Sequence, residues 1–148
     1  MRLVLFTLLL SVLFLAKSCT DEENLIDFKS SYKNVSGYPL LISGYGSGNR
    51  LLYSYALENN DSSPNCTVSS PSFLGASCGA DSIVVRFDSG RGFICASRFN
   101  NSSNQCFLSD KSPIGGTGQE EFYREIFPNT FEFLITKEDF ENAFELPQ

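Results

Sequence analysis

The positions of the five cysteines constrain this chain of 148 residues more than any other feature. Cys19 directly follows an apolar run, whereas Cys66, Cys78, Cys95 and Cys106 lie in the body of the chain. An even set of cysteines in an exported protein is typical of a disulfide framework, and four cysteines allow three pairings. We favour Cys66 with Cys78 and Cys95 with Cys106. Each bond then closes a loop of about a dozen residues and contributes roughly 3 kcal/mol in the chain-entropy model.

Residues 1–18 have the form of an export signal. Arg2 supplies a positive charge, and an apolar run follows from Leu3 to Ala16. About fourteen residues are too few to cross roughly 30 Å of hydrocarbon as a helix, so the run predicts a cleaved signal peptide rather than a membrane span. Small residues at Ala16 and Ser18 predict cleavage before Cys19.

Three parts of the chain are expected from these boundaries: a signal peptide at 1–18, a short acidic tether at 19–27, and a single folded domain at 28–148. Removal of the signal peptide takes away two of the eleven basic residues and none of the seventeen acidic ones, so the formal net charge changes from −6 to −8. The remaining basic residues are scattered singly. This charge pattern argues against nucleic acid as a partner and against direct binding to anionic lipid head groups.

The segment around Cys19 resembles a bacterial lipobox, although Lys17 departs from the usual pattern. The residues that follow, Cys19-Thr20-Asp21-Glu22-Glu23-Asn24, resemble the cysteine and acidic cluster common in Bacteroidota lipoproteins. The resemblance implies that Cys19 carries acyl chains such as palmitate and that the protein is attached to the outer membrane and faces outward. An acylated Cys19 also explains the odd number of cysteines, because it leaves an even set for disulfides.

Further segments also resemble small Bacteroidota lipoproteins of the cell envelope. The likeness rests on the strand entry at 34–42, on Asp81-Ser82-Ile83-Val84-Val85-Arg86-Phe87-Asp88, and on the closing stretch at 131–143. It covers about half of the mature chain, and its motifs are structural rather than catalytic. The resemblance therefore implies an architecture and a location but no activity.

A secreted eukaryotic glycoprotein, such as an effector or defence factor, is the alternative. Five matches to the N-glycosylation acceptor pattern favour it, at Asn34, Asn60, Asn65, Asn100 and Asn101. Asn and Ser are also ordinary turn residues, so matches of this kind arise by chance in a chain rich in both.

Short alternating runs predict six or seven strands and an antiparallel β-sandwich of immunoglobulin-like or transthyretin-like outline. The clearest strand is 81–88, with Ile83, Val85 and Phe87 on one face. Further strands are expected at 33–36, 38–45, 50–55, 91–97 and 130–136.

One or two short helices are expected near the C-terminus. The first is predicted at 119–127, with Phe122, Ile126 and Phe127 toward the core, and the second after Thr136. Residues 59–72 are expected to form a long polar loop.

The chain contains no histidine, which excludes histidine-dependent triads and histidine metal ligands. The cysteine spacing lacks a zinc pattern, so we expect no metal and no cofactor. Asp81 and Asp88 bracket one strand about 23 Å from end to end, too far apart for a glycosidase pair. Glu120 and Glu121 lie at an expected helix start. We therefore expect no enzyme; a hydrolase would need these acids to converge in one cleft.

Tyr53 and Tyr55 are the candidate binding residues. At strand spacing they share a face, and exposed tyrosines make good contacts with carbohydrate or protein ligands. On the solvent side they would form an aromatic platform, and on the inner side they would be ordinary core. We favour the core, because fourteen Phe and six Tyr must be largely buried.

Overall fold

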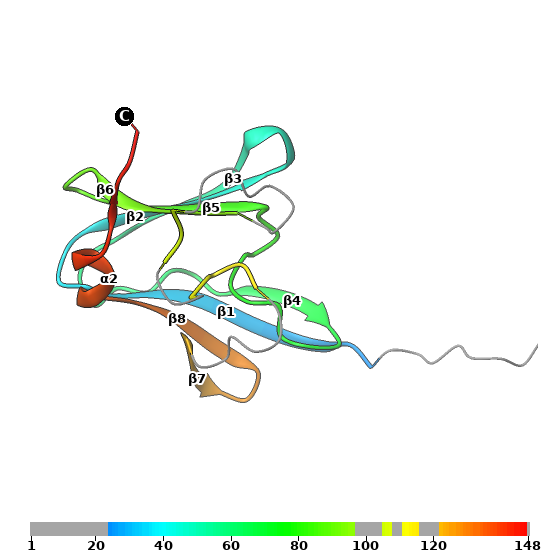
Figure 1. Cartoon of the computed structure of the whole chain (residues 1–148). Helices are drawn as coiled ribbons and strands as arrows, with labels where there is room; N and C mark the ends of the chain where they lie inside the picture. Colours follow the sequence, from blue (N-terminus) through cyan, green and yellow to red (C-terminus); the bar gives the residue numbers. More distant parts are fainter. Residues whose placement is uncertain (1–23, 97–104, 108–110, 116–121, 148) are drawn as a thin grey trace, which may run out of the picture.

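The computed structural model describes residues 24–96, 105–107, 111–115 and 122–147. Within these ranges two β-sheets, one of four strands and one of five, lie face to face (Figure 1). The predicted β-sandwich is confirmed. No helix in the described ranges combines the length and the apolar character needed to cross a bilayer.

The four-stranded sheet contains β1 (Ile26–Val35), β4 (Cys66–Ser70), β7 (Tyr123–Phe127) and β8 (Thr130–Thr136), in the order β4-β1-β8-β7. The five-stranded sheet contains β2 (Leu40–Gly46), β3 (Arg50–Leu57), β5 (Ser82–Phe87), β6 (Arg91–Ala96) and β9 (Phe144–Glu145), in the order β3-β2-β5-β6-β9. The short 3-10 helix η1 (Ser47–Asn49) joins β2 to β3, and helix α2 (Lys137–Glu141) follows β8.

One strand pair is parallel. Residues 29–35 of β1 pair with residues 130–136 of β8 in parallel register, whereas the other described pairs are antiparallel. A parallel pair needs a long crossover, and between β1 and β8 the chain passes through four of the strands of the other sheet, β2, β3, β5 and β6; the fifth, β9, follows β8. This pairing, which the expected antiparallel pattern did not include, places the start of β1 beside the start of β8.

The core lies between the two sheets and consists of the side chains that alternate inward along the strands. In β5 the predicted inward set, Ile83, Val85 and Phe87, is at most 1% exposed. From the opposite sheet Tyr32 and Phe133, both fully buried, meet edge to face with ring centroids 6.1 Å apart. Aromatic pairs of this geometry contribute about 0.5–1.5 kcal/mol beyond the area they bury.

The predicted helix at 119–127 is wrong where the structure describes it, because Tyr123–Phe127 is strand β7. This strand pairs with β8 through a turn at Pro128 and Asn129, and Asn129 has the positive φ (58°) that such a turn favours. Arg124 of β7 and Glu132 of β8 lie opposite each other and form an ion pair. Hairpin pairing therefore overrides a weak local helix pattern. Residues 119–121 lie outside the described ranges.

The loop expected at 59–72 contains a strand, β4, that pairs antiparallel with the first half of β1. Sequence alone did not reveal it, because the strand is short and polar and is stabilised by its partner rather than by its own pattern. The helix expected after Thr136 is present as α2. Thr136 and Asp139 form its capping box, with Asp in the place usually taken by Glu.

Candidate functional site

Tyr53 and Tyr55 lie on the inner side of β3 and pack against the core. Tyr55 is opposite Ile42 and Tyr53 is opposite Gly44, so both share the face of the buried side chains of β2. The two rings stack with centroids 5.2 Å apart. Gly44 makes this possible, because a Cβ at that position would lie 2.2 Å from Cζ of Tyr53. The geometry thus favours the core role over an open aromatic platform.

The hydroxyl groups of three tyrosines converge on one loop. Tyr32 Oη donates to the carbonyl oxygen of Ala76 at 2.6 Å, and Tyr53 Oη donates to that of Ser77 at 3.0 Å. The backbone N–H of Ala76 donates to Tyr123 Oη at 3.1 Å. Tyrosines from both sheets therefore hold the segment that leads into Cys78.

This tyrosine cluster is suited to a structural role rather than to proton transfer. Burial raises the pKa of Tyr32 well above its ordinary value and raises the pKa values of Tyr53 and Tyr123 in the same direction. A general base needs a pKa near the operating pH. At neutral pH these three hydroxyl groups stay protonated and act as hydrogen-bond donors.

Both favoured disulfides are present. Cys66 bonds to Cys78 and Cys95 bonds to Cys106, with sequence separations of 12 and 11 residues. The first bond links β4 to the loop held by the tyrosines, and the second links β6 to the segment 105–107. Each bond fastens a segment of little regular structure to a strand. It stabilises the fold because it lowers the conformational entropy of the unfolded chain.

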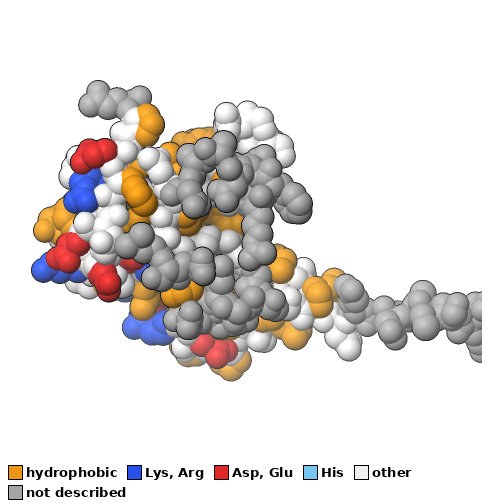
Figure 2. All heavy atoms as spheres, viewed as in Figure 1, with side chains coloured by type: hydrophobic (Ala, Val, Ile, Leu, Met, Phe, Trp, Pro, Cys, Tyr) orange, Lys and Arg blue, Asp and Glu red, His pale blue; other side chains and the backbone are white. Residues whose placement is uncertain are grey.

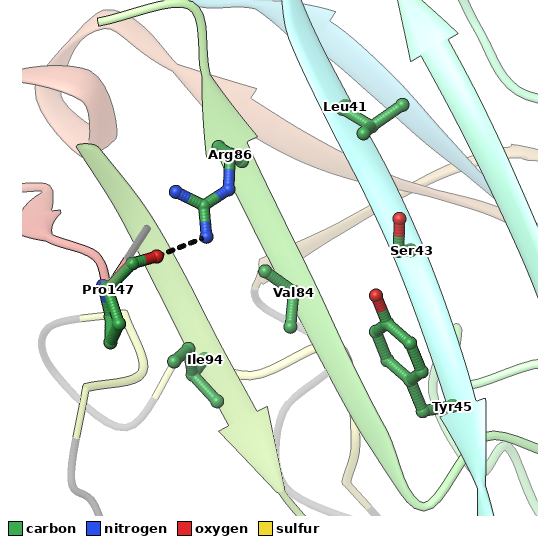
Figure 3. Close-up of a pocket in the computed structure, with 7 residues that line it drawn as sticks. All are labelled: Leu41, Ser43, Tyr45, Val84, Arg86, Ile94 and Pro147. Carbon is green, nitrogen blue, oxygen red and sulfur yellow. Dashed lines mark hydrogen bonds between the residues drawn. The ribbon is translucent and has the colours of Figure 1, made fainter. Parts of the chain in front are cut away.

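A shallow concavity of about 280 Å³ lies on the outer face of the five-stranded sheet. Figure 3 shows the side chains that line it, which come from three neighbouring strands and the C-terminal segment: Leu41, Ser43, Tyr45, Val84, Arg86, Ile94 and Pro147. Arg86 Nη2 donates to the carbonyl oxygen of Pro147 at 3.0 Å. Ser43 Oγ lies 3.0 Å from Ser54 Oγ of β3. The concavity therefore offers apolar side chains and several hydrogen-bonding groups at an open surface.

Sequence reasoning did not name this concavity. The available signal was the alternation of β2 and β5, which already put Leu41, Ser43, Val84 and Arg86 opposite the core face. The alternation does not reveal which strands are neighbours in the sheet. Tyr45 and Arg86 share a surface because β2 and β5 are neighbours.

Of the acidic residues considered for catalysis, the two within the described ranges, Asp81 and Asp88, do not come together. Asp81 precedes β5 and Asp88 follows it, so a whole strand separates them. Asp81 accepts a hydrogen bond from Ser47 Oγ at 3.0 Å. Glu120, Glu121 and the predicted lipidation residue Cys19 lie outside the described ranges. Within those ranges no group of three or more His, Cys, Asp or Glu is arranged to hold a metal ion.

The three glycosylation sequons in the described part differ in accessibility. The side chain of Asn34 is fully buried, and its Nδ2 donates to the carbonyl oxygens of Tyr38, Leu57 and Glu58. Asn60 and Asn65 are exposed. Since a glycan is attached through Nδ2, this fold excludes modification of Asn34 and leaves the other two accessible.

Comparison of the chain with protein-family models, with curated proteins and with solved structures finds no match.

Proposed function

We propose that this chain is a lipid-anchored lipoprotein of the cell envelope, with acyl chains on Cys19 and a β-sandwich that acts as a binding or accessory module rather than an enzyme. The observation that carries the proposal is the use of the cysteines. The two disulfides account for Cys66, Cys78, Cys95 and Cys106. By count, Cys19 at the end of the export signal remains for lipid.

The outer face of the five-stranded sheet is the surface that best suits a binding role. Tyr45 presents a ring and a hydroxyl group, and Arg86 presents a guanidinium group on the neighbouring strand. Tyr and Arg are the residue types most often found at the energetic centres of interfaces. Carbohydrate or protein are the ligand classes that this combination of apolar area and hydrogen-bond donors fits.

Mass spectrometry of the mature N-terminus tests the anchor. We expect the first peptide of the protein from its native source to begin at Cys19 and to carry the mass of acyl chains. In cells fed an alkyne-labelled fatty acid, Cys19→Ser is expected to abolish labelling. The matched control is the double variant Cys95→Ser, Cys106→Ser, which removes a disulfide and is expected to keep the label. A mature Cys19 with a free amine and no acyl mass would refute the proposal, as would a disulfide from Cys19 to another cysteine.

The second candidate is a secreted eukaryotic N-glycosylated protein stabilised by disulfides. The exposure of Asn60 and Asn65 favours it, since both can accept a glycan. Glycosidase treatment of the protein from its native source separates the two candidates. A shift in gel mobility that is lost when Asn60, Asn65, Asn100 and Asn101 are all changed to Gln would support the glycoprotein, and an unchanged mobility of the wild type supports the lipoprotein.

A further inference from the structure

Four large apolar side chains are exposed together at one end of the four-stranded sheet. Leu25 is 61% exposed and Ile26 40%, at the start of β1, while Ile126 is 39% and Phe127 70% exposed, at the end of β7. We call these four residues the apolar end. Two of them were expected in the core, and the hairpin of β7 and β8 instead turns them outward. Clustered exposed apolar residues mark contact surfaces more often than single ones do.

The strand topology brings the apolar end together. Thr130, at the start of β8, is opposite both Lys29 of β1 and Phe127 of β7. The register of β7 shifts between Glu125 and Phe127, and Ile126 therefore lies in a bulge on this edge strand. Figure 1 shows the start of β1 and the turn from β7 to β8 toward the same end of the sheet, and Figure 2 shows hydrophobic side chains at the surface where β1 begins.

The short length of chain between Cys19 and Leu25 indicates what this end faces. Cys19 lies six residues before Leu25, and six residues span at most about 21 Å when fully extended. A lipid on Cys19 therefore holds the apolar end near the bilayer. Val35, at the other end of the ten-residue strand β1, is about 30 Å further away along the strand.

We propose that the apolar end rests on the bilayer surface, with Leu25, Ile26, Ile126 and Phe127 in contact with the lipid interface. This inference rests on the lipoprotein proposed above. The contact depends on apolar area rather than on charge, because Lys29 and Arg124 at this end are balanced by Asp27 and Glu125. It sets the orientation of the sandwich, since acyl chains already supply the attachment. The far end of the sandwich then points away from the membrane.

The absence of Trp from the chain allows a direct test with single-Trp variants. The mature protein, residues 19–148, is made as Phe127→Trp, as Leu25→Trp and, for the matched control, as Val35→Trp, which replaces a side chain 37% exposed at the far end of β1. With the other cysteines in disulfides, the thiol of Cys19 is coupled to a maleimide lipid in phosphatidylcholine vesicles. Trp emission is then recorded with and without brominated phosphatidylcholine, and circular dichroism checks the fold of each variant.

We expect coupling to shift the emission of Trp at positions 127 and 25 to shorter wavelength, and we expect brominated lipid to quench it. Emission from position 35 is expected to stay unchanged. Equal quenching at all three positions, or none at positions 25 and 127, would overturn the inference. Because the anchor is attached chemically, this result does not depend on whether the cell acylates Cys19. Mass spectrometry of the mature N-terminus tests that point separately.

Discussion

At the scale of single residues, Gly44 decides how the edge strand β3 joins the core. The ring of Tyr53 lies across the backbone of Gly44, where any side chain would collide with it. From this position Tyr53 Oη reaches both the carbonyl oxygen of Ser77 and the hydroxyl of Tyr32, at 3.0 and 3.2 Å. One glycine thus permits a contact that links β3 to the opposite sheet and to the loop before Cys78.

Gly44→Ala is therefore expected to lower the free energy of unfolding by about 1–3 kcal/mol, because the added methyl group displaces the Tyr53 ring and its hydrogen bonds. Urea denaturation measures the loss. The control is the same change in a Tyr53→Ala background, where the space is already empty and the further cost is expected to be small. Equal costs in the two backgrounds would show that Tyr53 is not the group displaced.

At the scale of elements, a largely buried ion pair joins the segment 111–115 to helix α2. Lys111 Nζ lies 2.6 Å from Asp139 Oδ2 and 2.7 Å from the carbonyl oxygen of Leu134, and the Lys111 and Asp139 side chains are each 12% exposed. The ammonium group also lies 5.1 Å from the ring centroids of Phe107 and Phe133. Because Asp139 also caps α2, the same carboxylate orders the helix start and neutralises the lysine.

Lys111→Met is expected to cost about 3–5 kcal/mol of stability, because it leaves a largely buried carboxylate without its cation. Thermal or urea unfolding measures this. Lys137→Met serves as the control: Lys137 pairs with Glu141 on the surface, with side chains 73% and 60% exposed, and its loss is expected to cost at most about 0.5 kcal/mol. Similar effects of both changes would contradict a special role for the buried pair.

At the scale of the whole molecule, the tyrosine cluster makes stability depend on pH in the alkaline range. Burial raises the pKa values of Tyr32, Tyr53 and Tyr123 in the folded protein, whereas an unfolded tyrosine titrates near 10. Below about pH 10 both states keep the phenolic proton, and these groups add no pH dependence. Above it the unfolded chain loses protons that the folded protein retains, so stability falls as pH rises.

We expect the urea midpoint to fall steeply above about pH 10. Tyr123→Phe removes one buried titrating group. Above about pH 10, the slope of the unfolding free energy against pH is therefore expected to be shallower in this variant by about 1.4 kcal/mol per pH unit. The slope is compared with that of Tyr45→Phe, which removes a phenol on the outer face, away from the tyrosine cluster. An unchanged slope in Tyr123→Phe would mean that this phenol ionises as easily in the folded protein as in the unfolded one.

Much of the sandwich was predictable because apolar and polar residues alternate strongly along its strands. The pattern of 81–88 places Ile83, Val85 and Phe87 inward with no knowledge of the rest of the chain. Strand β4 and strand β7 were not predictable in this way, since each is short and acquires its conformation by pairing with β1 or β8. Their local preferences are weak: β4 is fixed by hydrogen bonds from β1, which is distant in sequence, and β7 by hydrogen bonds from its hairpin partner β8.

The sequence by itself determined the alternation of apolar and polar residues that makes a β-sandwich, and the even number of internal cysteines, with short separations within each pair, made the observed disulfides the favoured ones. Both are local properties, read within one strand or across a loop of about a dozen residues. Only the tertiary structure decided that Tyr53 and Tyr55 turn inward, that Asn34 is buried, and that Leu25 and Phe127 are both exposed toward the same end of one sheet. These outcomes depend on strand order and on the parallel pairing of β1 with β8, which are set by the packing of the whole core rather than by any single segment.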